Sequence, residues 1–391
     1  MSSVPHQSIV FTHRQLPVFL LVLGVFLIVL WTPFGHAQTE ISGFDEEAEA
    51  IEDARQTLPA ARRGSPIEAI LQKVFEKDYA SARSLLVPLL ATENVDALHI
   101  QAVLDENGWG GPKDLAAAIQ LYARAAAKGQ VDAQYSLGEL AYGKSGVKKD
   151  PERAIQWYQL AANQGHPGAK SRLGTIYVRG VDVEKDVPLG LRYIEEAANA
   201  GDRDAQFNLG VAYLNGNGRP QDYEKAGENF LYAAQQLHPD AQFNLALLYD
   251  SPHLGEPDPQ QTIFWMTAAA GLGLPKAYVA LGLLIGEGKG VGQSDRVAAD
   301  WFERAALAGD SEGQFLYALA LSQGKGRPQR TSEAVNWLEK SLASNDLNAE
   351  QRRQREALKK QLQARGSGTA TRASQARAPK PSRKKEKSLR P

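Results

Sequence analysis

The pattern of small, apolar and polar residues repeats along most of the chain with a period of 36 residues. Aligned on the small residue that opens each unit, the first parts of five units read AQYSLGELAY, AKSRLGTIYV, AQFNLGVAYL, AQFNLALLYD and AYVALGLLIG. The openings fall at Ala97, Ala133, Ala169, Ala205, Ala241, Ala277 and Gly313. A period of this length is typical of arrays in which each repeat buries its apolar face only against its neighbours.

The first part of each unit has the spacing of an amphipathic helix. A leucine usually follows the opening residue by four positions and a tyrosine often follows it by eight, so these side chains share one helical face. The residue directly after that leucine is small, which lets a second helix approach closely. These small residues are Gly138, Gly174, Gly210, Ala246, Gly282 and Ala318.

The second part of each unit predicts a second helix. In five units it reads AIQWYQLAANQG, GLRYIEEAANAG, TIFWMTAAAGLG, AADWFERAALAG and AVNWLEKSLASN. In these units one position carries a large ring, and a small pair such as Ala161 and Ala162 usually follows it. We expect this ring to face small residues of a neighbouring helix, so that adjacent hairpins interlock. The ring position is occupied by Trp157, Tyr193, Trp265, Trp301 and Trp337.

Turn residues separate the two helices of each unit. Asp150, Asp222 and Asp258 stand where a second helix begins, which is a favoured position for an N-cap. Glycines follow the first helix and close the unit, where a positive φ ends a helix at little cost. They are Gly180, Gly216, Gly288 and Gly324 in the turn, and Gly129, Gly165, Gly201, Gly273 and Gly309 at the close. No stretch alternates with a period of two for long enough to predict a strand.

These features together resemble the Sel-one-like repeat family, which is related to the tetratricopeptide repeats. The motifs that carry the resemblance are A-x-x-x-L-G-x-x-Y, the glycine turn, A-x-x-W-Y/F-x-x-A-A and the closing glycine, in seven units over residues 97–348. The resemblance implies an all-α fold, a right-handed α-solenoid of helix-turn-helix repeats whose concave surface is lined mainly by the first helices. Some units depart from the pattern, at Gln101 and Asp105 in the first, Asn229 and Leu237 in the fourth and Pro252 in the fifth.

The segments around the array differ in composition. Residues 65–96 predict a degenerate helical hairpin in which Ala82 is in phase with Ala118. Residues 349–363 predict a polar capping helix with Leu358 and Leu362 as its seam, and Ala349 opens a last half unit. Residues 38–64 are interpreted as an acidic linker, and residues 364–391 as a basic disordered tail.

Residues 1–37 are interpreted as a signal peptide or an N-terminal membrane anchor. The apolar run from Leu16 to Trp31 is long for the core of a signal peptide and short for a membrane span, so both interpretations stay open. Gly35 and Ala37 are spaced for cleavage before Gln38. Because Arg14 precedes the run and an acidic stretch follows it, we expect the body of the protein to be periplasmic, either free or anchored in the inner membrane.

Charge and cysteine content restrict the chemistry further. The formal net charge is −1, but the segment from Ala364 to Pro391 carries nine Lys or Arg and one acid, so the tail is strongly basic and the remaining chain acidic. Such a tail attracts anionic polymers, and on the expected side of the membrane those are envelope polymers or lipid headgroups and not nucleic acid. The absence of cysteine excludes disulfides, thiolate metal sites and cysteine nucleophiles.

Three motifs suggest ligand chemistry but lie where the repeat pattern needs those residues. GELAYGKS, from Gly138 to Ser145, matches a phosphate-binding loop in letters, yet a strand must precede such a loop and the pattern here predicts a helix. GEGKGVG, from Gly286 to Gly292, falls in the turn between two helices. His166 and His238 hold equivalent places two units apart, too far for one metal ion. We therefore predict no catalytic, cofactor-binding or metal-binding residues.

The sequence favours a scaffold that mediates protein–protein interactions in cell-envelope assembly, secretion or signalling, with a protein or peptide partner on the concave face. The predicted binding residues lie two and three positions after the opening residue and are Tyr135, Arg172, Phe207, Asn208, Phe243 and Asn244. An alternative is an envelope module that binds carbohydrate or lipid through the repeats and the basic tail. A hydrolase of envelope polymers is a further alternative, although no paired carboxylates or base–nucleophile pair supports it.

Overall fold

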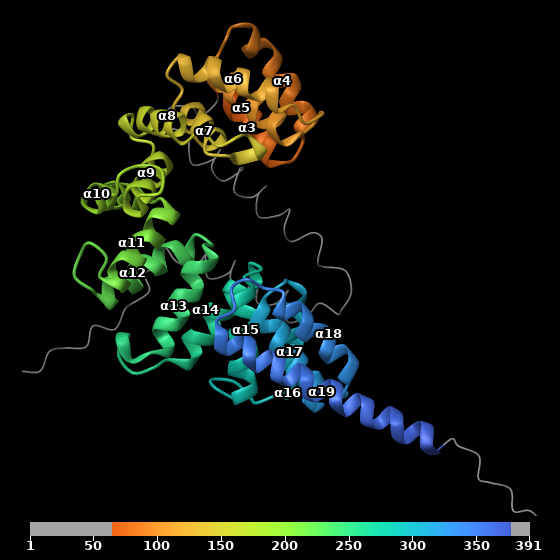
Figure 1. Cartoon of the computed structure of the whole chain (residues 1–391). Coiled ribbons are helices and arrows are strands. Elements are labelled where there is room, and N and C mark those ends of the chain that lie inside the picture. Colours follow the sequence, from red (N-terminus) through yellow and green to blue (C-terminus); the bar gives the residue numbers. More distant parts are fainter. Residues whose placement is uncertain (1–64, 377–391) are drawn as a thin grey trace, which may run out of the picture. The chain divides into compact units, whose positions relative to one another are not determined.

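The computed structural model describes the backbone of residues 65–376 and the side chains of residues 65–364 (Figure 1). Seventeen α-helices and two short 3₁₀ helices make up this part of the chain, and it contains no strand. The all-α prediction is therefore confirmed for residues 65–376. The predicted signal peptide or anchor, the acidic linker and residues 377–391 of the basic tail lie outside the described residues.

The chain divides into two compact units. The first runs to Asp258 and includes Gly271–Gly273, and the second comprises Pro259–Ala270 and the chain from Leu274. The helices of the first unit are α3 Pro66–Phe75, α4 Tyr79–Ala91, α5 Val95–Asn107, α6 Leu115–Ala127, α7 Val131–Ala141, α8 Pro151–Asn163, α9 Pro167–Arg179, α10 Val187–Asn199, α11 Arg203–Asn215, α12 Tyr223–Gln235 and α13 Pro239–Asp250, with the 3₁₀ helices η3 Lys144–Gly146 and η4 Pro252–Leu254. The helices of the second are α14 Pro259–Gly271, α15 Pro275–Glu287, α16 Asp295–Leu307, α17 Ser311–Gln323, α18 Thr331–Leu342 and α19 Ala349–Ala376.

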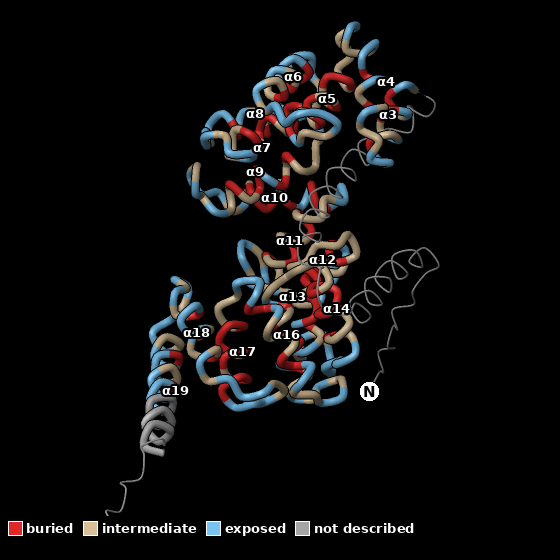
Figure 2. The backbone as a smooth tube through the Cα atoms, turned by 90° about the vertical axis from the view of Figure 1, so that its right-hand side faces the viewer, coloured by how far each residue is buried: buried red, intermediate tan, exposed pale blue. Residues whose placement is uncertain are grey.

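Each predicted repeat is a pair of successive helices, α5 with α6 through to α17 with α18. The opening alanines of six repeats are fully buried, since Ala97, Ala133, Ala169, Ala205, Ala241 and Ala277 are each 0% exposed. Leu137, Leu209 and Leu281 are likewise all buried. Figure 2 shows buried positions recurring from helix to helix, with exposed positions in many of the connections. The equivalence of these positions, on which the repeat assignment depends, is therefore confirmed.

The close approach of paired helices depends on the predicted glycines, which face the side chain one residue after the predicted ring position. A Cβ atom added to Gly138 would lie 2.5 Å from the ring of Tyr158, and one added to Gly210 would lie 2.7 Å from Phe230. Trp157 is half-buried and packs against the cluster that contains Ala125 and Ala133, so this ring faces small residues of neighbouring helices, as expected. Adjacent residues on a helix point about 100° apart, and the rings of Trp157 and Tyr158 therefore face different neighbours.

Both helices of most repeats start with a side-chain cap. Asp150 and Asp222 accept hydrogen bonds from the backbone N–H three residues on, as predicted, and the same happens at Asp78, Asp114 and Asp186. The turn glycines Gly180, Gly216, Gly288 and Gly324 end first helices in the left-handed region. Regular caps at this spacing fix where most of these helices begin.

The irregular turn at Pro252 packs differently from the turns of the other repeats. Its 3₁₀ helix η4 brings His253 onto Tyr223, with ring centroids 3.8 Å apart. Leu254 lies against Gly227 of α12, where the other repeats carry Ile, Leu, Val or Ala. A side chain from the turn therefore fills the space that the glycine leaves.

The C-terminal helix differs from its predicted form in two ways. Ala349 is exposed and does not occupy the buried place of an opening alanine, because α19 turns Arg355 and Leu362 toward α17 and α18 instead. The helix also continues to Ala376, past the expected boundary at residue 363. This extension contains Gly366 and Gly368, which disfavour helix, but no proline occurs before Pro379 to end it.

Candidate functional site

The six predicted binding residues lie on four first helices, α7, α9, α11 and α13, all in the first unit. Their surroundings differ, because adjacent repeats place different side chains against them. These contacts decide which of them remain available to a partner.

Two of the aromatic residues are stacked on histidines of the following repeat. The ring centroids of Tyr135 and His166 are 4.5 Å apart, and those of Phe207 and His238 are 4.4 Å apart. Tyr135 and Phe207 also contact the large rings of their own second helices, Tyr158 and Phe230. They are therefore packing residues at the junctions between repeats.

Arg172 and Asn208 bridge successive first helices. The Arg172 guanidinium donates two hydrogen bonds to the Glu139 carboxylate, at 2.8 and 2.9 Å. The Asn208 amide donates to the hydroxyl of Thr175, at 3.3 Å. In both cases the acceptor lies six positions after the opening residue of one repeat and the donor lies three positions after the opening of the next.

This bridge is interrupted at the next junction. The residue equivalent to Glu139 and Thr175 is Val211, whose side chain has no hydrogen-bonding atom. Asn244 instead donates to the backbone carbonyl of Asp240 in its own helix, at 2.9 Å. One turn further along α13, Leu247 is 45% exposed. An apolar side chain and an amide with no bridge to α11 thus lie together on this first helix, next to the half-buried Phe243.

The lysine–serine pair that resembled a phosphate-binding loop has a structural partner. Gly138 lies inside α7 and Gly143 in the turn, as predicted, and no strand precedes them. Glu106 of the preceding repeat is 2% exposed, and its carboxylate accepts hydrogen bonds from the Tyr122 and Ser145 hydroxyls, each at 2.8 Å. The ammonium of Lys144 lies 3.4 Å from the same carboxylate. Ser145 therefore donates a hydrogen bond to the buried Glu106 carboxylate, and Lys144 supplies the opposite charge beside it.

Buried tyrosines next to carboxylates are poor acids in this protein. Burial raises the pKa of Tyr122 well above its usual value, and the Glu106 carboxylate adds to the effect. Burial and the Glu139 carboxylate raise the pKa of Tyr158 in the same way. Both hydroxyls are therefore protonated hydrogen-bond donors at neutral pH and are not poised for proton transfer.

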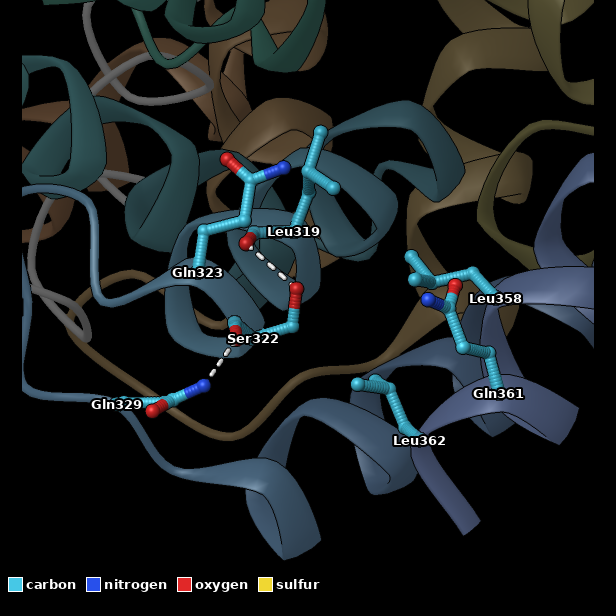
Figure 3. A pocket seen from close by; sticks show the side chains of 7 residues that line it. All are labelled: Leu319, Ser322, Gln323, Gln329, Leu358, Gln361 and Leu362. Atoms are coloured by element: carbon cyan, nitrogen blue, oxygen red, sulfur yellow. Dashed lines mark hydrogen bonds between the residues drawn. The ribbon is translucent and has the colours of Figure 1, made fainter. Parts of the chain in front are cut away.

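A cavity of about 400 Å³ lies between α17, the turn that follows it and α19 (Figure 3). Its lining consists of Leu319, Ser322, Gln323, Gln329, Leu358, Gln361 and Leu362. The Ser322 hydroxyl donates to the carbonyl of Leu319, at 2.8 Å, and the Gln329 amide donates to the carbonyl of Ser322, at 2.7 Å. No carboxylate, imidazole or amine lines this space, so it offers no general acid or base.

His166 and His238 have a role that the sequence interpretation missed. Each imidazole caps the helix that follows it, because its Nδ1 atom accepts the N–H of Ala169 or Ala241. Asn94, Gln130, Asp202 and Asp310 cap their first helices from the same position of the repeat. The 36-residue spacing of these six residues was the available signal. Among residues 65–364, no cluster of three His, Asp or Glu is arranged to hold a metal ion.

Sequence reasoning also missed Glu139 and Leu247. Both lie six positions after the opening residue, where the seven units carry Val, Glu, Thr or Leu. The donor lies three positions after the opening residue, and its acceptor lies six positions after the opening of the preceding repeat. Comparing these two positions in successive repeats would have shown which donors have an acceptor. Among the described helices, none has the length and hydropathy that crossing a membrane requires.

Comparisons with known proteins agree with this architecture. The family model described as Sel1 repeat matches seven segments, at residues 102–130, 131–166, 167–202, 203–236, 239–274, 275–310 and 311–346. One similar solved structure is a protective antigen present in uropathogenic Escherichia coli strains that displays an SLR fold, with 25% identity, a TM-score of 0.61 and coverage of 88% of this chain and 77% of that one. Another is a Sel1 repeat protein from Oxalobacter formigenes, with 28% identity, a TM-score of 0.54 and coverage of 61% and 95%. No curated protein sequence matches the chain.

Proposed function

The chain belongs to the Sel1 repeat family, and from this we propose that it is an exported or membrane-anchored scaffold for proteins of the cell envelope. Sel1 repeats form helical scaffolds that generally mediate protein–protein interactions. In this chain a protein or peptide partner would lie along the face lined by the first helices. Assembly, secretion and signalling at the envelope are the processes in which such a scaffold would act.

The observation that carries the proposal is the interrupted bridge on α13. At two earlier junctions, a side-chain donor of one first helix has its acceptor on the preceding first helix. These donors are Arg172 and Asn208. At Asn244 no such bridge forms, and the exposed Leu247 lies one turn away. An amide beside an apolar side chain suits an extended peptide, whose backbone pairs with the amide while a side chain covers the leucine.

Site-specific photo-crosslinking tests this assignment. We expect a photoreactive residue at position 247 to crosslink a defined partner in living cells, because partners bury exposed apolar residues at the centre of an interface. Leu160 is the matched control, since it is 48% exposed but lies on the second helix α8. The same partner captured equally from both positions would contradict the proposal, as would no capture from position 247.

A substitution separates binding from folding. Leu247→Asp places a charge on the proposed contact and should lower partner recovery about tenfold or more, as for a central interface residue. The thermal midpoint should stay nearly unchanged, because Leu247 is a surface residue. Full recovery with the aspartate in place would contradict the role of α13.

The envelope location is proposed from the apolar run Leu16–Trp31 and the acidic stretch after it. The solved relative from Escherichia coli is described as a protective antigen, which favours a location outside the cytoplasm. N-terminal sequencing of the mature protein should begin at Gln38 after cleavage or near Met1 for an anchor. A mature protein that starts near Met1 and is recovered in the cytoplasmic fraction would contradict export.

A further inference from the structure

The first helices of the array are capped by chemically different side chains at one repeated position. Asn94, Gln130, Asp202 and Asp310 use an amide or carboxylate oxygen, whereas His166 and His238 use an imidazole nitrogen. The two imidazoles cap α9 and α13, and α11, which lies between them in the repeat order, is capped by Asp202. Imidazole is the group in this set whose ordinary pKa lies near physiological pH.

The two histidines make equivalent contacts with the backbone and with an aromatic ring. Nδ1 of His166 accepts the N–H of Ala169 at 3.0 Å, and Nδ1 of His238 accepts the N–H of Ala241 at 3.2 Å. Each ring is stacked on the aromatic residue of the preceding repeat, and its side chain is only 10% or 13% exposed. The imidazoles therefore link a helix start to the neighbouring repeat.

Only the neutral ring can serve as this cap. A proton on Nδ1 replaces the lone pair with a second donor that faces the helix N–H, and the hydrogen bond is lost. The added charge would also lie at the N-terminus of a helix, where the partial charge of the backbone is positive. Both effects oppose protonation in the folded state.

Nearby charges act in both directions. The carboxylate of Asp132 on α7 lies 3.6 Å from Nε2 of His166, and Glu139 also favours the cation, while His99 on α5 opposes it. For His238 the carboxylate of Asp204 on α11 lies 3.7 Å from Nε2, Asp240 adds to it and Arg203 opposes it. Burial outweighs the carboxylates and lowers the pKa of both imidazoles below the usual value near 6.5.

We propose that α9 and α13 are acid-sensitive joints, at which protonation of His166 and His238 releases the helix start and loosens the contact with the preceding repeat. The helix α7 keeps its cap under the same conditions, because the Gln130 side chain does not titrate. Because the neutral form is favoured in the folded state, stability at these joints is complete above the unfolded pKa and falls as the pH decreases below about 6.5. The inference does not depend on the proposed function.

Hydrogen exchange in the full-length chain tests the inference with an internal reference. We would compare the amides of Ala169 and Ala241 with that of Ala133, which is capped by the non-titrating Gln130. Ratios within one sample cancel the general pH dependence of exchange. Between about pH 7.5 and about pH 5.5, exchange at Ala169 and Ala241 relative to Ala133 should rise about fivefold, which is the effect of losing one typical N-cap. An unchanged ratio would overturn the inference.

The double variant His166→Asn and His238→Asn isolates the imidazole. Asparagine caps without titrating, and Asn94 already does so in α5, where it accepts the N–H of Ala97 at 3.0 Å. The pH dependence of the ratio should disappear in this variant. If the change persists with asparagine at both positions, another group is responsible and the inference fails.

Discussion

At the scale of single residues, glycines set how closely the two helices of a repeat approach. The structure places Gly138 against Tyr158 and Gly282 against Phe302, where an added Cβ would lie 2.5 and 2.4 Å from the rings. Within a helix, alanine is favoured over glycine by about 1 kcal/mol. Overpacking a core costs about 1–3 kcal/mol, so the balance depends on whether the ring can move.

Gly138→Ala should therefore destabilise the protein by about 1–2 kcal/mol. Tyr158 is 0% exposed and its hydroxyl donates to Glu139, so its ring has no free space into which to shift. Gly286→Ala is the control, because the nearest atom is the Cβ of Ala298 at 3.5 Å and the substitution should be neutral or stabilising. Thermal unfolding of the two variants measures the difference. Equal midpoints would contradict the prediction that the close contact of the two helices at Gly138 requires glycine.

A second residue-scale feature is the left-handed conformation of Leu237. The glycines that close other repeats, such as Gly165 and Gly201, have φ near 90°, and Leu237 occupies the equivalent position with φ 62°. A non-glycine residue in this region costs about 1 kcal/mol. Leu237→Gly should thus raise the free energy of unfolding by about 0.5–1 kcal/mol.

The reverse substitution provides the comparison for this prediction. At Gly165 no atom lies within 4 Å of an added Cβ, so Gly165→Ala measures the backbone effect alone and should lower stability by about 1 kcal/mol. Denaturant midpoints measured for both variants show whether each substitution raises or lowers the free energy of unfolding. A less stable Leu237→Gly protein would show that the packing of the leucine outweighs its backbone strain.

At the scale of helices, α19 buries a charged side chain that its polar sequence does not predict. Leu358 and Leu362 were predicted as its seam, and Leu362 is indeed buried. The largest buried side chain of the helix, however, is Arg355, which is 1% exposed. Its guanidinium donates to the hydroxyl of Ser341 at 2.8 Å and to the carboxylate of Glu312 at 2.5 Å. Hydropathy ranks arginine as a surface residue, so the pattern gave no sign of this contact.

Arg355→Ala should weaken the docking of α19 by about 2–3 kcal/mol. The substitution removes the ion pair with Glu312 and the hydrogen bond to the Ser341 hydroxyl, and it leaves a cavity. Lys359→Ala is the control, since its ion pair with Glu339 is partly exposed and is worth less than about 1 kcal/mol. Limited proteolysis within α19 should become faster in the first variant only. Equal cleavage rates in the two variants would show that the buried guanidinium does not hold the helix.

At the scale of the whole molecule, the fold was predictable because the same side chains return in phase and are buried alike, as Ala133 and Ala205 show. The candidate site was less predictable, because it depends on pairs of residues in different repeats. Asn208 and Asn244 occupy equivalent positions in identical AQFNL segments, yet only Asn208 bridges to the preceding helix. The difference arises from Thr175 and Val211 one repeat earlier, which a comparison of single positions does not reveal.

A row of stacked hairpins has two ends, and each end would offer an apolar surface to another copy of the chain. In the second unit α19 closes one end, and its outward positions Arg353, Gln354, Glu356 and Lys360 are exposed and polar. Ala349 is exposed and does not occupy the buried position of an opening alanine, so α19 offers no apolar surface on which a further hairpin could pack. The C-terminal helix thus opposes end-to-end growth of the array into filaments.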